Sequence, residues 1–322
     1  MHALTFSSFG GPEVLDWTSL PDPQPTPGHA VIRTRAIGLN FADIYRRQGR
    51  YHLAGSPPWI AGYEASGEIH ALHADDADRG WHVGQRVAFA DSAFANAELV
   101  AVALDKLIAL PDDIAHDTAA AVLLQGLTAQ FLIEDSYALR PGNTVLVHAA
   151  GGGVGLLLTQ LATSRDARVF ALASSAEKRA AALAAGAFAA IDSSSDWPAQ
   201  LRTLAPDGVD VAYDSIGRTL AQSMAATRTG GTVVFFGMAA GDPDPVDPRV
   251  LMDRSLTLVG GDLWNVLTSA QARQSRAERL FAAIRDGHLQ VNIAARFPLR
   301  DGAAAHALLE GRGSVGKVLL LP

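Results

Sequence analysis

The spacing of apolar positions changes near residue 115, and this change divides the chain into two parts. In the first part, short apolar runs separated by turn residues predict the strands of an irregular, mostly antiparallel β domain. These strands are expected at residues 3–6, 30–37, 64–72, 86–89 and 97–102. In the second part, apolar strands recur between helical segments, which is typical of a doubly wound parallel sheet.

The second part opens with a helix expected at residues 117–133. Its expected strands lie at residues 145–147, 168–173, 189–191, 209–214, 231–237 and 256–260. A helix at residues 177–185, closed by Gly186, is one of those that lie between the strands. The tail has expected helices at 269–285 and 301–310 and a closing strand at 316–321, and we expect it to return to the first part. The expected fold class is therefore α/β with a discontinuous second domain.

A turn of small residues between the first of these strands and a helix is the strongest chemical signal. The helical pattern opens at Val154, after a strand that ends at Val147. A strand, a glycine turn and a helix in this order direct a helix N-terminus at a pyrophosphate. The match to the dinucleotide fingerprint is imperfect because its first glycine position is alanine; the alternative is a tight turn that holds no ligand. The residues expected at the phosphates are Ala150, Gly152, Gly153, Val154 and Gly155.

The end of the second strand indicates which dinucleotide is bound. Sites that prefer NAD carry an acidic residue there for the ribose 2′-hydroxyl. Here Ser174 and Ser175 are followed by Lys178, and a hydroxyl pair with a cation suits a 2′-phosphate. Glu177, three residues after Ser174, is interpreted as part of a capping box, and Lys178 has the alternative of an ordinary solvated helix residue. The sequence favours NADPH.

Composition narrows the class of protein. The formal net charge is −7, which argues against a nucleic-acid partner. No cysteine is present, so disulfides, thiolate nucleophiles and thiolate-bound zinc are excluded. The most apolar stretch, residues 119–133, is interrupted by polar residues, so no membrane span is expected and a cytoplasmic protein is the default. The ten histidines receive no metal or catalytic role, and His148 is expected to be a packed, hydrogen-bonded residue.

Several segments together resemble the zinc-independent, zeta-crystallin-like quinone oxidoreductases of the medium-chain dehydrogenase/reductase superfamily, over essentially the whole chain. The segments are residues 36–51, 62–67, 84–87, 126–129, 148–155, 213–217 and 236–237. The resemblance implies a homodimer in which a GroES-like substrate domain (residues 1–122 and 262–322) accompanies a Rossmann domain (residues 123–261), with NADPH in the cleft between them. Zinc-dependent relatives carry Gly-His-Glu where this chain has Gly62-Tyr63-Glu64, so no catalytic metal is expected.

The resemblance also implies roles for individual residues. Asn40 and Tyr45 would line the nicotinamide and substrate pocket as catalytic residues; the alternatives are a turn residue and a helix-face aromatic. Residues 192–195 lack the Tyr and Arg that help to clamp the adenosine end in some members, with Ser193 among the residues present instead. The remaining expected cofactor contacts, each with packing or plain exposure as its alternative, are Thr128, Phe236, Gly237, Met238 and Lys317.

The expected function is NADPH-dependent reduction of quinones without a metal. A quinone is already electrophilic, so positioning and hydrogen bonding can replace a Lewis acid. Reduction of the double bond of 2-alkenals or enones is an alternative within the same superfamily. A low-turnover NADPH-binding structural or sensor protein is an alternative of another class.

Overall fold

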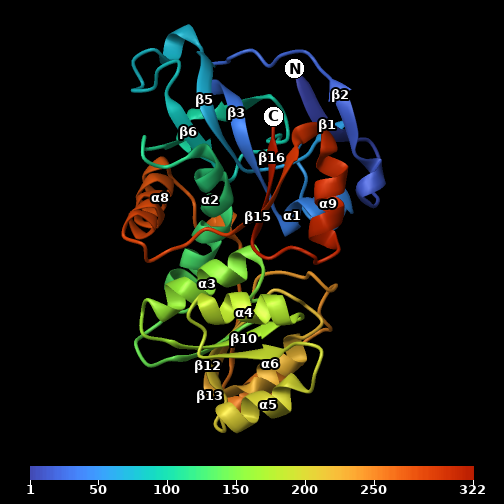
Figure 1. Cartoon of the computed structure of the whole chain (residues 1–322), viewed down its shortest axis with the longest axis vertical. Helices are drawn as coiled ribbons and strands as arrows, with labels where there is room; N and C mark the ends of the chain where they lie inside the picture. Colours follow the sequence, from blue (N-terminus) through green and yellow to red (C-terminus); the bar gives the residue numbers. More distant parts are fainter. The chain divides into compact units, whose positions relative to one another are not determined.

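The computed structural model describes residues 1–322 and divides into two compact units. Unit 1 comprises Met1–Gln125, Leu267–Ala282 and Val291–Pro322, and unit 2 comprises Gly126–Val266 and Ala283–Gln290. In Figure 1, the blue and red ends of the chain belong to unit 1, and most of unit 2 is the stretch from green through yellow to orange. The expected fold class, a parallel Rossmann-like sheet with a discontinuous, mostly β second part, is confirmed.

Unit 1 is built around two sheets. The smaller has the order β2-β1-β4, and the larger has the order β15-β16-β3-β5-β6-β8 with β7 paired to β3. The pairings are antiparallel except that of β15 with β16. The strands are β1 (His2–Phe6), β2 (Asp16–Ser19), β3 (His29–Leu39), β4 (Trp59–Ile60), β5 (Ala65–Leu72), β6 (Arg86–Phe89), β7 (Leu99–Ala103), β8 (Ile108–Ala109), β15 (Ile293–Pro298) and β16 (Lys317–Leu321).

Apolar side chains from these strands form the core of unit 1. Phe6 of β1, Ile32 of β3 and Phe89 of β6 are among its buried members. Of its helices, α1 (Phe41–Arg47) and α9 (Gly302–Glu310) lie wholly within the unit, whereas α2 (His116–Phe131) and α8 (Ala270–Arg285) each contain a boundary between the units.

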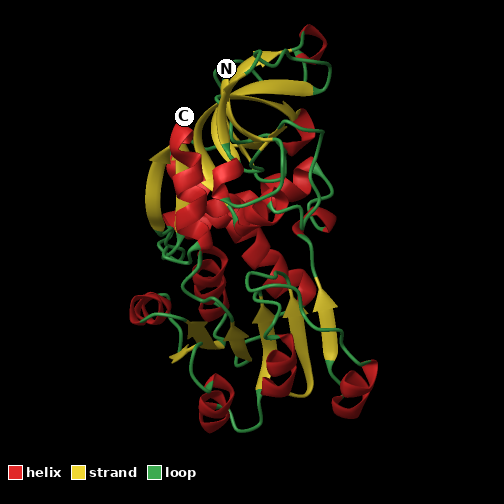
Figure 2. Cartoon of the chain, turned by 90° about the vertical axis from the view of Figure 1, so that its right-hand side faces the viewer, coloured by secondary structure: helices red, strands yellow, loops and turns green.

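Unit 2 contains one six-stranded parallel sheet with the order β11-β10-β9-β12-β13-β14. Because all its pairings are parallel, the carboxyl ends of the strands lie at the same edge, as the arrowheads in Figure 2 show. The strands are β9 (Thr144–Val147), β10 (Arg168–Ala173), β11 (Ala189–Asp192), β12 (Val209–Asp214), β13 (Thr227–Phe235) and β14 (Thr257–Gly260). The accompanying helices are α3 (Gly153–Thr163), α4 (Ala176–Ala184), α5 (Trp197–Leu204), α6 (Leu220–Ala226) and α7 (Pro248–Arg254).

Two local predictions need correction. The capping box of Ser174 with Glu177 is wrong: the N-cap of α4 is Ser175, whose hydroxyl accepts a hydrogen bond from the backbone of Lys178. The helix expected to reach residue 133 instead stays α-helical to Phe131 and continues as a π-helical turn, Leu132–Ser136. Both helix ends depend on local hydrogen bonds, one to a side-chain hydroxyl and one within the backbone, that the apolar pattern does not encode.

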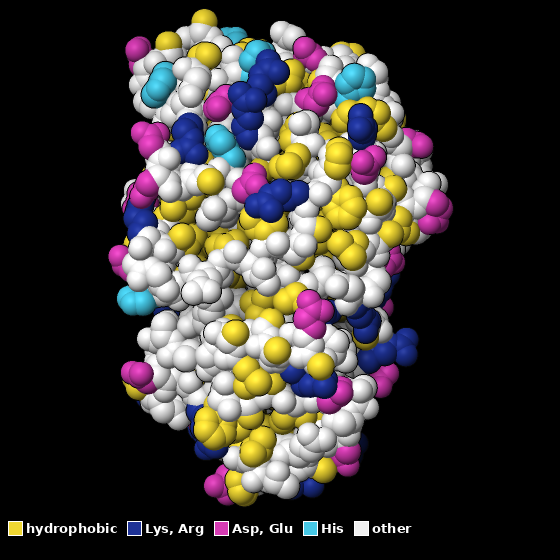
Figure 3. Space-filling view, in the orientation of Figure 1, with side chains coloured by type: hydrophobic (Ala, Val, Ile, Leu, Met, Phe, Trp, Pro, Cys, Tyr) yellow, Lys and Arg dark blue, Asp and Glu magenta, His cyan; other side chains and the backbone are white.

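The surface carries charges of both signs. On the face shown in Figure 3, Lys and Arg side chains are interspersed with Asp and Glu side chains rather than gathered in one stripe. None of the helices has the length and apolar character needed to cross a membrane.

Candidate functional site

The small-residue turn lies at the carboxyl end of β9, in unit 2. The backbone NH of Ala150 donates to Leu172 O at 2.9 Å, which fixes the turn against β10, and Gly152 is the N-cap of α3. A Cβ on Gly155 would lie 2.4 Å from Ala149 O and 2.7 Å from the Cα of Ala150. No side chain fits there, so only glycine allows the helix to start this close to the turn.

The first turn of α3 therefore presents backbone amides. No side chain caps this helix, and the first intrahelical bond recorded at its start runs from Leu156 N to Gly152 O. The NH groups of Gly153, Val154 and Gly155 consequently have no carbonyl within their own helix. Together with the helix dipole, these amides fit a diphosphate. The residues predicted at the phosphates thus form one continuous cradle.

Lys178 of α4 lies against this turn. A Cβ on Gly151 would come within 2.6 Å of the Cβ of Lys178, so the absence of a side chain at Gly151 lets α4 approach. Ser174 and Ser175 follow β10 directly and are exposed. The structure thus brings the predicted 2′-phosphate residues, Ser174, Ser175 and Lys178, to the same edge of the sheet as the glycine turn.

The neighbouring strand β11 and helix α4 each add one charge that the sequence reasoning gave no role. Asp192 ends β11 and lies directly opposite Ala173 of β10 in the parallel register. Its carboxylate pairs with Arg179 Nη1 at 2.8 Å and accepts two bonds from Ser194, from the backbone NH at 2.9 Å and the hydroxyl at 2.6 Å. Hydrogen bonds from Ser194 are the main cause that lowers the pKa of Asp192, with Arg179 contributing.

The carboxyl end of β13 supplies the third group. Phe236, Gly237 and Met238 follow β13 and are half-buried, and Phe236 N donates to Asp214 O at 3.0 Å. Because β13 is parallel to β9 and β10, these residues lie at the sheet edge that carries the glycine turn. Thr128, another predicted cofactor contact, does not follow a strand of this sheet; it is a half-buried residue of helix α2.

His148 is packed and hydrogen-bonded, as expected. Its Nε2 lies 2.9 Å from Ser223 Oγ, and Ser223 donates to Asp214 Oδ2 at 2.6 Å. Because the single hydroxyl proton of Ser223 goes to Asp214, the histidine is the donor to Ser223. Burial lowers the pKa of His148, so it is held neutral.

In unit 1, Asn40 lies in a buried polar cluster with Glu64 and Lys317. The Asn40 amide donates to Glu64 Oε2 at 2.9 Å and to Gly38 O at 3.2 Å, and its Oδ1 accepts from Lys317 Nζ at 2.8 Å. Lys317 Nζ also lies 2.5 Å from Glu64 Oε2, and Leu124 N donates to the other oxygen of Glu64 at 2.7 Å. The lysine and glutamate side chains are 1% and 0% exposed. Burial lowers the pKa of Lys317, an effect that Glu64 opposes.

The hydrogen bonds of this cluster restrict the role of the Asn40 side chain. Both hydrogens of its side-chain amide are already donated inside unit 1. Its backbone NH donates to Asp43 Oδ2 at 2.9 Å, which closes the start of α1. The ammonium of Lys317, a predicted cofactor contact, is directed at Glu64 and Asn40. Asn40 is therefore arranged to fix the helix that follows it.

That helix, α1, carries Tyr45. Tyr45 is 8% exposed, and its ring packs edge-on against Phe41 at 5.7 Å between centroids and against Tyr51 at 6.4 Å. Asp43 and Arg46 form a buried ion pair on the same helix, and burial raises the pKa of Asp43. The role of Glu64 was not predicted, because in the motif Gly62-Tyr63-Glu64 the sequence analysis considered only the departure at Tyr63.

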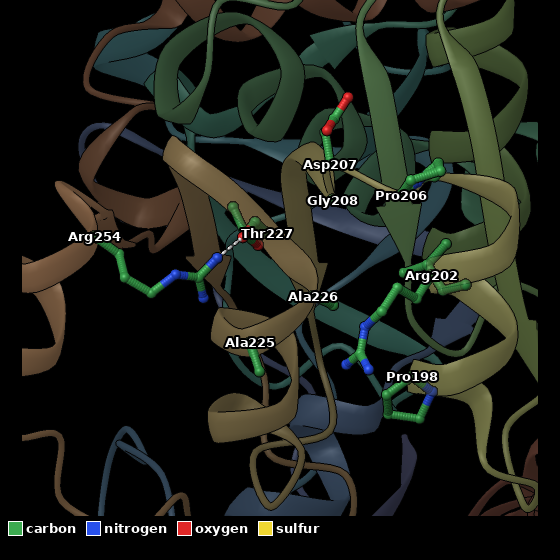
Figure 4. A pocket seen from close by; sticks show the side chains of 11 residues that line it. Pro198, Arg202, Pro206, Asp207, Gly208, Ala225, Ala226, Thr227 and Arg254 are labelled. Atoms are coloured by element: carbon green, nitrogen blue, oxygen red, sulfur yellow. Dashed lines mark hydrogen bonds between the residues drawn. The ribbon is translucent and has the colours of Figure 1, made fainter.

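A small hollow elsewhere in unit 2 contains none of the predicted residues. It has a volume of about 130 Å³ and lies at the amino ends of β12 and β13, the opposite sheet edge from the glycine turn. Figure 4 shows Arg254 on one side, bonded to Thr227, and Arg202 of α5 on the other. Arg254 also donates to Met224 O at 2.7 Å, so it serves to cap the carbonyl end of α6.

Two family models match the chain. Residues 26–112 match the alcohol dehydrogenase GroES-like domain, and residues 153–277 match the zinc-binding dehydrogenase model. The second model is named for metal-binding members, whereas this chain has no cysteine to supply a thiolate ligand.

Similar proteins cover the full length. A quinone oxidoreductase of Pseudomonas aeruginosa is 37% identical, with 99% of each chain covered. A 2-haloacrylate reductase of a Burkholderia species is 34% identical, with 97% of this chain and 96% of the relative covered. Among solved structures, a quinone oxidoreductase of Escherichia coli complexed with NADPH is 32% identical, covers 100% of both chains and superposes with a TM-score of 0.96.

Proposed function

Because the chain belongs to the quinone oxidoreductase family of the medium-chain dehydrogenase/reductase superfamily, we propose that it reduces quinones with NADPH. The observation that carries this proposal is the cradle at the start of α3, where Gly155 leaves no room for a Cβ and the first-turn amides face outward from the helix end. When bound, NADPH supplies the hydride for the reduction.

The proposed cofactor residues follow the edge of the parallel sheet. The amides from Gly152 to Gly155 bind the diphosphate, and Ser174, Ser175 and Lys178 bind the 2′-phosphate. Residues 236–238 and Thr128 hold the nicotinamide end. We propose residues 123–261 as the cofactor-binding domain and residues 1–122 with 262–322 as the substrate domain.

The proposed substrate-side residues are Asn40 and Tyr45. A tyrosine hydroxyl can donate to a carbonyl oxygen that gains negative charge during reduction. Asn40, whose amide hydrogens are engaged by Glu64 and Gly38, positions the helix that carries Tyr45. The proposed reaction uses no metal, since Tyr63 stands beside Glu64 and no cysteine is available as a ligand.

A panel of acceptors tests the proposal. The loss of NADPH absorbance is followed with 1,4-benzoquinone, 1,2-naphthoquinone and a 2-alkenal, and each is repeated with NADH. Fast oxidation of NADPH by a quinone is expected. If no quinone oxidises it, the proposal is wrong; faster turnover of the alkenal would support double-bond reduction, which the similar 2-haloacrylate reductase favours. Tight NADPH binding without turnover would indicate a sensor or structural protein.

A glycine variant connects the activity to the cradle. Gly155→Val puts side-chain atoms where a Cβ already lies 2.4 Å from Ala149 O, so NADPH binding is expected to fall by about a hundredfold or more. Gly313→Ala is the matched control, since its Cβ would meet its nearest atom at an ordinary 3.4 Å. Unchanged affinity in a folded Gly155→Val protein would contradict the assignment of this cradle.

We also propose a homodimer formed through the β14 edge of unit 2. β14 ends the strand order, so one side of its backbone has no partner strand. Val250 and Met252 are 42% and 71% exposed, which leaves apolar surface on α7, the helix that precedes β14 in the chain. Light scattering on the purified protein checks this, and a monomer at micromolar concentration would contradict it. A cytoplasmic location stays a prediction of the sequence.

A further inference from the structure

The adenosine end of the proposed dinucleotide site contains a carboxylate that ought to oppose NADPH. Asp192 lies opposite Ala173 at the carboxyl end of β10, where this fold places the ribose of a dinucleotide. An uncompensated carboxylate at this place repels a 2′-phosphate and can accept a hydrogen bond from a free 2′-hydroxyl. By itself, Asp192 would favour NADH.

The structure compensates this charge within unit 2. Arg179 Nη1 lies 2.8 Å from Asp192 Oδ2, and Oδ1 accepts both bonds that Ser194 donates. The arginine and the aspartate side chains are only 25% and 35% exposed, so this pair is less screened by water than a fully exposed one. The oxygen atoms of Asp192 are thus directed at Arg179 and Ser194.

Arg179 is also well placed to act on the same strand end. It follows Lys178, which packs against the glycine turn, and its Nη1 lies 3.4 Å from Ala173 O. Arg179 therefore joins the end of β10 to the end of β11. Segment 192–195 lacks the Tyr and Arg that serve as a clamp in some relatives, and its Asp192 is instead paired with Arg179 of α4.

We propose that the Arg179–Asp192 ion pair determines coenzyme preference by neutralising the carboxylate beside the 2′-phosphate residues Ser174, Ser175 and Lys178. This inference rests on the proposed NADPH-dependent function. Arg179 acts through Asp192 and is a positioning and charge-compensating residue. Its removal exposes the 2′-phosphate of NADPH to an unpaired negative charge, whereas NADH carries no such phosphate.

The test measures the dissociation constants of NADP⁺ and NAD⁺ by calorimetry, independently of turnover. In Arg179→Met, the constant for NADP⁺ is expected to rise about tenfold and that for NAD⁺ less than about twofold, with a smaller effect at high salt. Arg179→Lys keeps the charge and should retain most of the preference. Adding Asp192→Asn to Arg179→Met should restore NADP⁺ binding to within about threefold of the wild type.

Arg202→Met is the matched control because it removes the same charge from the same unit, at the opposite sheet edge shown in Figure 4. It should leave both constants unchanged. Circular dichroism confirms that each variant is folded before binding is compared.

Three results would overturn the proposal. Equal weakening of both coenzymes in Arg179→Met would indicate a merely structural role. Selective weakening that Asp192→Asn fails to rescue would mean that Arg179 contacts the phosphate directly. Weaker NAD⁺ binding in Asp192→Asn alone than in the wild type, with NADP⁺ binding not weakened, would mean that Asp192 holds the ribose hydroxyl. Failure of the wild type to bind either coenzyme would refute the proposed function itself, which is a distinct outcome.

Discussion

Replacement of Lys317 by methionine tests the buried cluster around Asn40 most directly. Lys317 and Glu64 are 1% and 0% exposed, and their charged atoms lie 2.5 Å apart. In Lys317→Met the Glu64 carboxylate keeps only its bonds from Leu124 N and the Asn40 amide. Removing one member of a buried ion pair costs about 3–5 kcal/mol because the other charge is left without compensation.

A double variant separates the charge effect from simple loss of packing. Lys317→Met combined with Glu64→Gln removes both charges, and a glutamine oxygen can still accept from Leu124 N. Replacing a buried pair by neutral groups is often close to neutral, so the double variant should be more stable than Lys317→Met by at least about 2 kcal/mol. Lys106→Met is the matched control in unit 1, because Lys106 donates at 2.6 Å to a carbonyl, Asp91 O, and is expected to cost about 1 kcal/mol.

Hydrogen exchange is the suitable assay because the chain has two compact units, which makes a single unfolding transition an unsafe assumption. Opening free energies are read from peptides of β5 and β16, the strands that adjoin Glu64 and carry Lys317. The reasoning is refuted if Lys317→Met costs no more than Lys106→Met, or if the double variant is as unstable as Lys317→Met. The coenzyme affinity of the folded Lys317→Met protein also tests the predicted role of Lys317 as a cofactor contact. If the lysine bound the phosphates that NADPH and NADH share, its removal would weaken the binding of both coenzymes.

Three further predictions concern other buried groups. Burial lowers the pKa of His306 to about 3, below the 6.5 of a free histidine. As the pH drops, the histidine of the unfolded chain therefore takes up a proton before that of the folded chain. The free energy of unfolding is expected to fall by about 1.4 kcal/mol per pH unit between pH 6.5 and pH 3. Opening free energies of α9 peptides, measured by hydrogen exchange and corrected for the intrinsic exchange rate, should fall less steeply with decreasing pH in His306→Gln than in the wild type. An unaltered pH dependence would contradict the assignment. The hydroxyl of Tyr213 is buried without a hydrogen-bond partner, so Tyr213→Phe should leave the stability of unit 2 unchanged or raise it. A loss of stability above about 1 kcal/mol would show that the hydroxyl has a hydrogen-bond partner. Gly38→Ala would place a Cβ 2.3 Å from Ala120 O and from Glu64 Oε2. It should lower the opening free energy of unit 1 by about 3 kcal/mol or more in the hydrogen-exchange experiment. Exchange as slow as in the wild type would show that the strand shifts to accommodate the added methyl group.

The order of strands and helices could be predicted from the sequence because it depends on short-range patterns. The strand, turn and helix around Gly152 are adjacent in the chain, so the cradle for phosphates follows from local residue choice. The Asn40 cluster could not be predicted in this way. Lys317 and Asn40 are 277 positions apart and meet only because β16 pairs with β3, with Val318 opposite Leu39. A buried lysine on a closing strand looks, from the sequence, like any exposed lysine.

The coenzyme argument shows why the register of a sheet matters as much as a motif. The sequence places no acidic residue at the end of β10, and this absence by itself favours NADPH. The parallel pairing of β10 with β11 nevertheless brings Asp192 to the same place from the neighbouring strand. The preference of such a site therefore depends on the sum of charges from both strand ends, and here that sum is changed by one residue of α4, Arg179. A dinucleotide site whose second strand lacks an acid can consequently lose its preference for NADPH by a substitution on the following helix, with every residue of the glycine turn unchanged.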